Sequence, residues 1–513
     1  MDPLIRNRQE AVEAVEAYSP AEQQFNQRRK TTGMVLAPVL FLAMLALPAG
    51  SMSPEAHRLA AIIVLVVTLW VSEALPLPVS ALLGPLLAIV LRVAPASKAL
   101  APFADPIIFL FIGSFILAES MYAHGLDRRI AFSALSSRLI GRSAGRLLVV
   151  YGGVSVVLSM WISNTATTAM LFPIGLSIVT HLSSQPIAAQ PRFRRFAATM
   201  MLISAFGASI GGMATPIGTP PNLIGVGMLR DLVGIDVSFF RWMMLGLPIS
   251  LTLYAVLAAG FWVVGARGLQ LPRDTADLVQ RELDRLGRLT RGERNVITAF
   301  LITVFLWVFP GVLAIAGFRE SWLGKAYEAS MPEAGAALTG AILLFVLPVD
   351  WRTRRFTMSW GEAVRIDWGT ILLFGGGLAL GSMAFSTGLA ASVGNAVSSW
   401  VPSHSVVAFT ILFTCMAAGL SEMTSNTASA SMIVPIAIAV SRAAGISPVE
   451  PAIGATLGAS VCFMLPISTP PNAIAYSSGH VPIGTMIRYG VLLSVTACIV
   501  IIVMISALAT FLF

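Results

Sequence analysis

The sequence predicts an all-α polytopic membrane protein with about eleven transmembrane helices, two re-entrant hairpins and two broken helices. Hydrophobic residues make up 56% of the chain and charged residues only 11%, and the mean hydropathy is +0.82. A soluble domain usually contains about a quarter of charged residues, so this composition indicates a membrane setting. In addition, two short polar motifs each occur twice, which predicts that the hairpins and broken helices form an inverted-topology repeat.

The predicted spans are apolar stretches of about 20 residues, the length at which a helix crosses a bilayer. They begin near Thr32, Arg58, Leu75, Asp105, Ala197, Trp242, Asn295, Glu333, Asp367, Pro451 and Tyr489. Residues 1–32 mix acidic and basic side chains, unlike a cleaved signal peptide, and we expect Arg28, Arg29 and Lys30 to hold this tail in the cytoplasm. The net charge is +8, but the basic residues are spread over separate loops, so nucleic-acid binding is not expected.

The distribution of Lys and Arg predicts the topology. Basic residues cluster at 28–30, 128–146, 192–195, 267–294 and 352–365, and the positive-inside rule places all of these clusters in the cytoplasm. Residues 147–191 lie between the second and third clusters, so we expect a hairpin that turns back at Ser163 to Thr165. When the later membrane crossings are counted in the same way, we expect residues 402–441 to form a second hairpin that enters from the opposite face. The fourth cluster alternates Arg with Asp and Glu, which predicts a solvated helix that links the two repeats.

The repeated motifs identify a candidate site. Ser163-Asn164-Thr165-Ala166 returns as Ser425-Asn426-Thr427-Ala428 at an offset of 262 residues (425 minus 163). Thr219-Pro220-Pro221-Asn222 returns as Thr469-Pro470-Pro471-Asn472 at an offset of 250 residues (469 minus 219). Paired prolines remove two backbone donors, so each helix must break there. A simple proline kink or a helix N-cap would not require the same polar residues in both halves, whereas the binding site of a secondary transporter would.

The motifs offer hydroxyls, amides and unpaired carbonyls, which are groups that can bind a cation together with a carboxylate. Residues 147–191, 197–229 and 451–487 contain no Lys, Arg, Asp or Glu, and residues 402–441 contain only Glu422. The charge of a bound anion must therefore be met by neutral groups, helix ends and a coupling cation. Glu422 is either a carboxylate that braces the hairpin tip or a proton sensor. Packing roles are expected for Cys415, Cys462 and Cys498.

The doubled motifs, within the strings SNTATTAM and SEMTSNTAS, resemble the divalent anion:sodium symporter family, whose members carry di- and tricarboxylates and, in some branches, sulfate. The resemblance covers nearly the whole chain after Arg29. It implies Na⁺ as the coupling ion and no organic cofactor. The implied sodium ligands are Ser159, Ser163, Asn164 and Gly218 in one site and Ser421, Ser425, Asn426 and Ser468 in the other. The residues implied to bind substrate are Asn164, Thr165, Thr219, Pro220, Asn426, Thr427, Thr469 and Pro470.

The same resemblance implies sodium-coupled symport of di- or tricarboxylates, of the succinate, malate, fumarate or citrate class, by an elevator-type mechanism. A homodimer in a bacterial inner membrane is expected. A sodium-independent carboxylate exchanger and a sulfate transporter of the same fold remain open alternatives. An enzyme is not expected, because the sequence contains no His-Glu-x-x-His motif and no acid pair or Ser-His couple at a plausible spacing.

The expected division of the chain follows from the resemblance and the charged loops. Its parts are a cytoplasmic tail (1–32), scaffold (33–126), a cytoplasmic connecting helix (127–144), transport domain (145–265), a cytoplasmic linker (266–294), scaffold (295–390), a connector (391–401) and transport domain (402–513).

Overall fold

The computed structural model describes residues 20–50, 52–138, 140–272, 274–398 and 405–512. The helices of the first half are α2 (Pro20–Ala46), α3 (Pro54–Ser72), α4 (Leu77–Val90), α5 (Ala96–Leu100), α6 (Pro106–Ala123), α7 (Leu126–Leu135), α8 (Ala144–Ser159), α9 (Asn164–Ser183), α10 (Phe193–Gly212), α11 (Pro220–Val233), α12 (Phe239–Phe261) and α13 (Asp274–Arg285). Those of the second half are α14 (Arg291–Ile315), α15 (Trp322–Ser330), α16 (Glu333–Val346), α17 (Trp360–Ala363), α18 (Trp368–Ser386), α19 (Leu389–Ser398), α20 (Val406–Ser421), α21 (Asn426–Ala443), α22 (Val449–Gly458), α23 (Pro470–Ser477) and α24 (Ile483–Leu512).

The predicted fold class is confirmed. Among the described residues, eight helices are long and apolar enough to span a membrane, and the pair α15–α16, bent by 65°, would make a ninth. Every predicted span corresponds to one helix or to a broken pair, because α10–α11 and α22–α23 take the place of two continuous spans. The antiparallel strands β1 (Pro348–Asp350), just before the fifth basic cluster, and β2 (Arg355–Phe356), within it, were not predicted.

The first predicted hairpin is α8 and α9, and its two ends lie at the same face as the basic connectors. Arg129 Nε lies 2.5 Å from Glu293 Oε1, which joins the second basic cluster to the linker that contains α13. Arg192 Nη1 donates to the carbonyl of Arg267 at 2.6 Å, which joins the third cluster to the same linker. The chain therefore enters and leaves the first hairpin on one side, as the charge distribution predicts.

The second hairpin, α20 and α21, ends at the opposite face. Arg442, near the end of α21, donates to the carbonyl of Leu232 near the end of α11 at 2.9 Å. Its guanidinium also lies 5.8 Å from the centroid of the Phe385 ring near the end of α18. Helices α10–α11 and α18 both begin near basic clusters and run away from them. The two hairpins thus enter from opposite faces, which is the arrangement of an inverted repeat.

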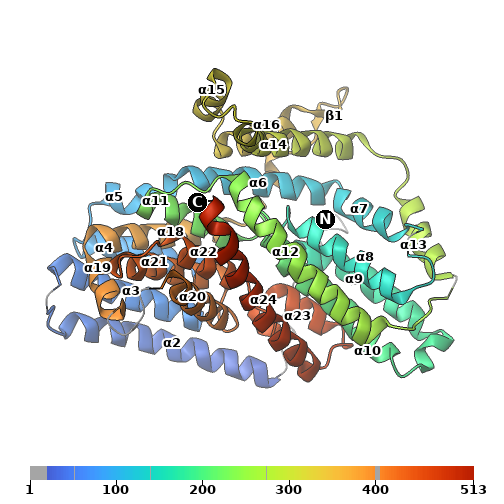
Figure 1. Ribbon diagram of the computed structural model, residues 1–513, viewed down its shortest axis with the longest axis horizontal. Helices are drawn as coiled ribbons and strands as arrows, with labels where there is room; N and C mark the ends of the chain where they lie inside the picture. Colours follow the sequence, from blue (N-terminus) through green and yellow to red (C-terminus); the bar gives the residue numbers. More distant parts are fainter. Residues whose placement is uncertain (1–19, 51, 139, 273, 399–404, 513) are drawn as a thin grey trace.

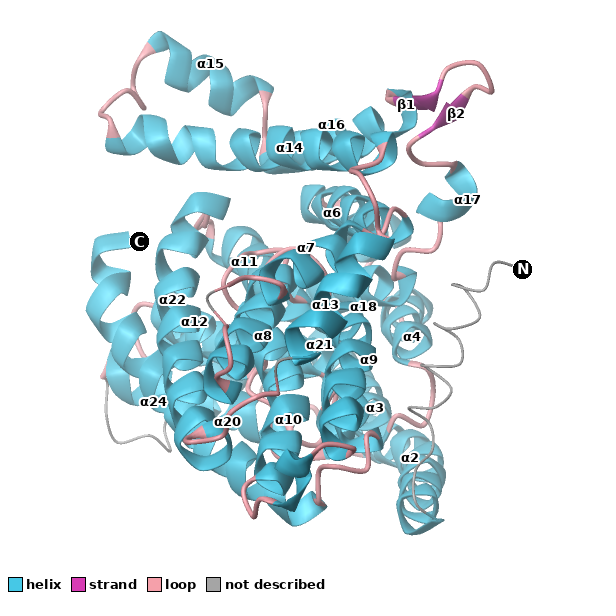
Figure 2. Ribbon diagram, turned by 90° about the vertical axis from the view of Figure 1, so that its right-hand side faces the viewer, coloured by secondary structure: helices cyan, strands magenta, loops and turns pink. Residues whose placement is uncertain are grey.

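The outer helices form two edges around these hairpins. Helices α14, α15 and α16, together with β1 and β2, form a layer along one side of the molecule, and α16 packs on α6 (Figures 1 and 2). Helices α2 and α3 lie side by side along another edge. Large apolar side chains of the α14–α16 layer are exposed, including Leu301, Phe305, Ile315 and Val346. Such exposure fits a surface that faces lipid rather than water.

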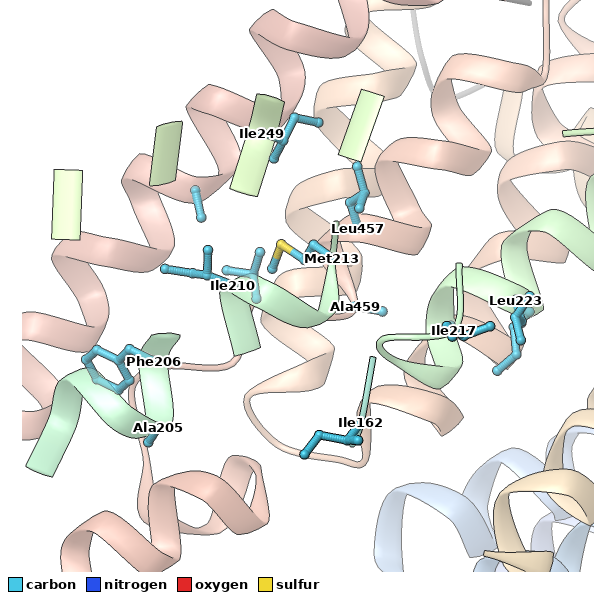
Figure 3. Packing of buried hydrophobic residues seen from close by; sticks show 14 of the residues in the cluster. Ile162, Ala205, Phe206, Ile210, Met213, Ile217, Leu223, Ile249, Leu457 and Ala459 are labelled. Carbon is cyan, nitrogen blue, oxygen red and sulfur yellow. The ribbon is translucent and has the colours of Figure 1, made fainter. Parts of the chain in front are cut away.

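The two repeats interlock at the centre. Helix α9 of the first hairpin contacts α23 of the second repeat, and α21 of the second hairpin contacts α11 of the first. A Cβ atom on Gly225 of α11 would lie 2.0 Å from Thr456 Oγ1 of α22, so this crossing requires glycine. Apolar residues of both repeats surround the first break, with Ile162 from the hairpin tip and Leu457 and Ala459 from the second repeat (Figure 3).

Cysteine labelling can test whether both ends of the first hairpin lie on the same side of the membrane. In a background without the three native cysteines, Ser143→Cys and Gln190→Cys should react with a membrane-impermeant maleimide from the same side, because both flank the first hairpin. Ser447→Cys, which follows the second hairpin, should react only from the other side. Labelling of the first two positions from opposite sides would contradict the inverted repeat.

Candidate functional site at the two broken helices

The first break is held together by one asparagine. Helix α10 ends at Gly212 and α11 begins at Pro220. The side chain of Asn222 reaches back across the break, and its Nδ2 donates to the carbonyls of Gly212 at 2.9 Å and Thr215 at 2.7 Å. The Gly212 carbonyl lies at the end of α10, where a helix leaves its last carbonyls without intrahelical amide partners, and the Thr215 carbonyl lies within the break, where the Gly218 amide also reaches it at 3.3 Å. The asparagine therefore supplies donors that water would supply outside a membrane.

The second break repeats this arrangement. Asn472 Nδ2 donates to the carbonyls of Cys462 at 2.9 Å and Leu465 at 3.0 Å. All three residues stand 250 positions after their counterparts in the first break, the same offset that relates the two proline motifs. Asn222 and Asn472 are both fully buried. The fourth residue of each motif is therefore a structural clamp that sets the shape of the break.

The hairpin tips also have matching hydrogen bonds. Ser159 Oγ, at the end of α8, donates to Asn164 Oδ1 at 2.7 Å. Ser421 Oγ, at the end of α20, donates to Asn426 Oδ1 at 2.8 Å. Each bond closes the tight turn between two hairpin helices and fixes the direction of the asparagine amide. The orientation of both amides is thus set before any ligand binds.

The two tips differ in helix capping. Ser163 is the N-cap of α9, and its Oγ accepts the amide of Ala166 at 3.2 Å. Ser425 occupies the same position before α21 without a side-chain capping bond. Thr219 and Thr469 precede α11 and α23, also without such a bond. The N-cap interpretation therefore applies only to Ser163, and its hydroxyl keeps a second lone pair for a ligand.

Several oxygen atoms converge at the first tip and break. A Cβ atom on Gly218 would lie 2.6 Å from the Gly212 carbonyl oxygen and 3.0 Å from the Ser159 carbonyl oxygen. A Cβ atom on Gly212 would lie 2.5 Å from Asn164 Oδ1 and 3.2 Å from the Gly218 carbonyl oxygen. Side chains at these two glycines would therefore fill a cradle lined by carbonyl and amide oxygens. Hard cations prefer such oxygen ligands.

The second site contains side chains where the first contains glycines. Cys462 stands at the position of Gly212, and Ser468 stands at that of Gly218. Asn426 Nδ2 lies 3.3 Å from Cys462 Sγ, in donor geometry. Cys462 is fully buried, as expected of a packing residue, and its thiol also contacts Asn426, a predicted sodium ligand. The second site therefore contains a sulfur atom and a hydroxyl group where the first has no side chains.

Glu422 braces the second hairpin tip. Its Oε1 accepts from the Phe463 amide at 2.8 Å and from Ser494 Oγ at 3.2 Å. Its Oε2 accepts from the Met464 amide at 3.0 Å and from Ser468 Oγ at 2.7 Å. Only 6% of the residue is exposed. Four donors hold this one carboxyl group, which supports the bracing interpretation over a proton sensor.

The first repeat joins the same tip and break by another route. Met160 stands at the position of Glu422 and offers no side-chain acceptor of that kind. Instead, Thr215 Oγ1 of the break donates to the Met160 carbonyl at 2.5 Å and accepts from the Gly218 amide at 3.1 Å. In the first repeat, a side chain of the break links the hairpin tip to the break. In the second repeat, a side chain of the hairpin does so.

The predicted site residues all lie on the two tips and the two breaks. Buried members are Ser159, Asn164, Gly218, Thr219, Ser421, Thr427, Ser468 and Thr469; the partly buried ones are Thr165, Pro220, Ser425 and Asn426; Ser163 and Pro470 are exposed. Hydrogen bonds join Ser159 to Asn164 and Ser421 to Asn426, whereas Ser468 Oγ is bonded to Glu422. Their ligand roles stay predictions.

The sequence interpretation missed the contributions of Gly212, Thr215, Cys462 and the two clamping asparagines. The offset of 250 residues extends across all these positions, so a comparison of the halves beyond the proline motif could have found them. In the described part of the chain, no group of three or more His, Cys, Asp or Glu side chains could hold a metal ion. A cation at the cradle would therefore be bound by neutral oxygen atoms.

Comparison with known proteins decides the family. The family model for the sodium:sulfate symporter transmembrane region matches residues 28–513, which is nearly the whole chain. The chain belongs to the sodium:sulfate symporter family. The predicted resemblance is thereby confirmed.

Relatives of this family member include two named sodium-dependent dicarboxylate transporter SdcS. The protein from Staphylococcus saprophyticus is 30% identical over 482 residues, and that from Staphylococcus aureus is 32% identical over 480 residues. Each alignment covers 92% of this chain and 90% of the relative.

Two solved structures have a similar fold. The Alcanivorax borkumensis YdaH transporter gives a TM-score of 0.52 at 14% identity and covers 81% of this chain and 88% of that one. Neisseria gonorrhoeae MtrF, described as illuminating a class of antimetabolite efflux pumps, gives a TM-score of 0.52 at 16% identity and covers 82% and 83%. At these identities the likeness concerns the fold alone.

Substitution of Gly218 tests the oxygen cradle. In Gly218→Ala the added methyl group would lie 2.6 Å from the Gly212 carbonyl oxygen, so we expect at least about a tenfold loss of apparent sodium affinity. Sodium binding can be followed as the rise in melting temperature with sodium concentration, with potassium as the control ion. Ser468→Ala is the matched variant of the second repeat, which adds no bulk and removes one hydrogen bond to Glu422. An unchanged sodium response in Gly218→Ala would show that no cation occupies the cradle.

Proposed function

We propose that the protein is a sodium-coupled symporter of di- or tricarboxylates. One observation carries this proposal: two oxygen-lined sites, related by an inverted repeat, lie where the segments around them supply no basic side chain. An anion held there needs a positive partner, because burial of an unpaired charge is costly. Bound sodium supplies that partner. Binding of the cation therefore precedes or accompanies binding of the anion, which is the basis of coupling.

The two asparagines of the hairpin tips connect the two ligands. Asn164 Oδ1 and Asn426 Oδ1 each accept a hydrogen bond from the end of the preceding hairpin helix and lie at the predicted cation sites. Thr165 and Thr427 follow directly and offer hydroxyls to a carboxylate. A cation that orders a tip also orders its threonine, so sodium and substrate stabilise each other's binding.

A carboxylate substrate is favoured over sulfate by the staphylococcal relatives, which are sodium-dependent dicarboxylate transporters and align over nine-tenths of the chain. The family description itself names sulfate. The residues of the site fit either tetrahedral or planar oxyanions, so substrate competition is the deciding measurement. Succinate, malate, fumarate and citrate are the substrates proposed.

The proposed mechanism is an elevator motion in a homodimer in the bacterial inner membrane, with the N-terminus in the cytoplasm. The interlocked contacts of α9 with α23 and of α21 with α11 support this division, because they tie both hairpins and both breaks into one body. This transport domain comprises residues 145–265 and 402–513. The scaffold comprises residues 33–126 and 295–390, and it includes the α14–α16 layer that stands at one side (Figure 2).

Sodium coupling is tested by uptake into liposomes. Labelled succinate should enter proteoliposomes down an inward sodium gradient, and uptake should vanish when choline replaces sodium. If sodium carries net positive charge inward, each charge is worth about 2.3 kcal/mol per 100 mV, so an inside-negative potential should accelerate uptake. Equal uptake without sodium but with internal carboxylate would instead indicate an exchanger. Inhibition by excess sulfate and not by dicarboxylates would indicate a sulfate transporter.

The tip residues can be tested separately. Loss of the tip amide in Asn164→Ala, where it is buried, or in Asn426→Ala, where it is partly buried, should cost about 1 to 3 kcal/mol, which is roughly a five- to hundredfold loss of affinity. Sodium and succinate affinities should fall together. Thr165→Val and Thr427→Val should mainly weaken succinate binding. Thr298→Val, on helix α14 of the proposed scaffold, is the matched control because, among the described residues, its hydroxyl bonds only to the Arg294 carbonyl of its own helix. Parent affinities in both asparagine variants would make the tips structural caps.

A further inference from the structure

One arginine of the scaffold contacts the tip of the second hairpin. Arg29, near the beginning of α2, donates from Nη1 to the carbonyl of Met423 at 3.2 Å. Its Nη2 donates to Glu73 Oε2 at 2.9 Å. Met423 lies in the turn between α20 and α21, next to the brace residue Glu422. A single guanidinium thus joins α2, the end of α3 and a hairpin tip.

The sequence analysis expected Arg29 only to help hold the N-terminal tail in the cytoplasm and predicted no contact with the second hairpin. Only 17% of its side chain is exposed. In the described part of the chain, its Nε is buried without a hydrogen-bond partner. A solvated anchor would leave all three nitrogens in water. The guanidinium is instead largely buried, and it contacts Met423 and Glu73.

Both neighbours of Arg29 are held in fixed positions. One turn along α2, a Cβ atom on Gly33 would lie 1.9 Å from Ser72 Oγ, so the backbone of α2 packs directly on the Ser72 side chain at the end of α3. Glu73 follows directly and has a left-handed backbone (φ 49°, ψ 33°), which is uncommon for a residue other than glycine. The unusual conformation turns the chain out of α3 and presents the carboxylate to Arg29.

The contact also indicates where the transport domain lies relative to the scaffold helices. Arg29 lies near the start of α2 and Glu73 follows the end of α3, so both belong to the face that carries the N-terminal tail. The second hairpin enters from the opposite face, yet its tip reaches these helix ends. In the proposed orientation, the transport domain is therefore displaced toward the cytoplasm in this structure.

From this geometry we propose that Arg29 and Glu73 form a latch that holds the second hairpin tip at the cytoplasmic ends of α2 and α3. Arg29 is a positioning residue: it acts through the backbone of Met423 and not on the ligands. The latch must open in every transport cycle, because the tip leaves α2 when the transport domain moves outward. It therefore sets the ratio of inward to outward conformations. This inference rests on the proposed elevator function.

The size of the effect follows from the contact. A partly exposed charged hydrogen bond of this kind shifts a two-state equilibrium by about two- to tenfold. Arg29→Ala removes both hydrogen bonds of the guanidinium. Glu73→Gln keeps the shape of the side chain but removes the charge that orients the guanidinium. Arg29→Lys keeps the charge and loses the fork that spans two acceptors, so its effect should be intermediate. Arg28→Ala, at the exposed neighbouring position, is the matched control.

Distance measurements between paired spin labels provide the readout. One label replaces Ser330 in the scaffold and the other replaces Ser447 in the transport domain, in a background without native cysteines. The inward population should fall relative to the outward one by about two- to tenfold in Arg29→Ala and Glu73→Gln, and should not change in Arg28→Ala. Measurement is made without ligand and again with sodium and succinate.

The experiment distinguishes failure of the latch proposal from failure of the proposed function. If two populations exist and respond to sodium and succinate, but their ratio is the same in Arg29→Ala, Glu73→Gln and the parent, the latch is refuted and the proposed function stands. If the parent shows one population that ignores sodium and succinate, the elevator function itself fails. If Arg29→Ala does not fold, Glu73→Gln alone decides, since it retains the size and polarity of the native side chain.

Discussion

The structure depends on one constraint: backbone groups inside a membrane must find partners without water. Each broken helix ends in the protein interior and leaves carbonyls beyond its last turn. Asn222 and Asn472 bond two such carbonyls each, and the paired prolines at the start of α11 and α23 remove amides that would otherwise need acceptors. The carbonyls of Gly212, Gly218 and Ser159 converge near Asn164 and line the proposed cation cradle. The folding of the break that gives its backbone groups partners thus also brings the oxygen atoms of the cradle together.

The two repeats meet this constraint with different side chains, and the difference bears on function. Thr215 joins tip and break in the first repeat, whereas the Glu422 carboxylate does so in the second. The carboxyl group of Glu422 lies beside the second site, whereas Met160 at the matching position of the first repeat has no such group. The thiol of Cys462 beside Asn426 adds to this asymmetry. Duplicated motifs therefore do not imply equal sites, and sodium affinity should differ between them.

The sequence allowed much of this to be predicted, because hydropathy, basic clusters and proline pairs act locally. The helical hairpins, the breaks and the inverted relation follow from such signals and are present. What could not be predicted depends on which segments meet in three dimensions. Nothing near Glu422 in the sequence indicates that its partners are the amides of Phe463 and Met464, about forty residues away. Likewise, a basic residue before a span usually marks a membrane surface, and only the packing of α2 on α3 brings Arg29 to Met423.

A transporter of this kind needs a rigid binding site on a domain that moves. The contacts within the proposed transport domain differ accordingly from those between it and the scaffold. Inside the transport domain, tips and breaks are joined by buried hydrogen bonds to backbone carbonyls and amides, which would each cost about 1 to 3 kcal/mol if left unpaired. At the scaffold, Arg29 makes a partly exposed bond to Met423, and water can replace it when it opens. The proposed motion therefore breaks the contacts that water can compensate and preserves those that it cannot. In the proposed elevator mechanism, this difference would allow the domain to move while the ligands stay bound in an unchanged geometry.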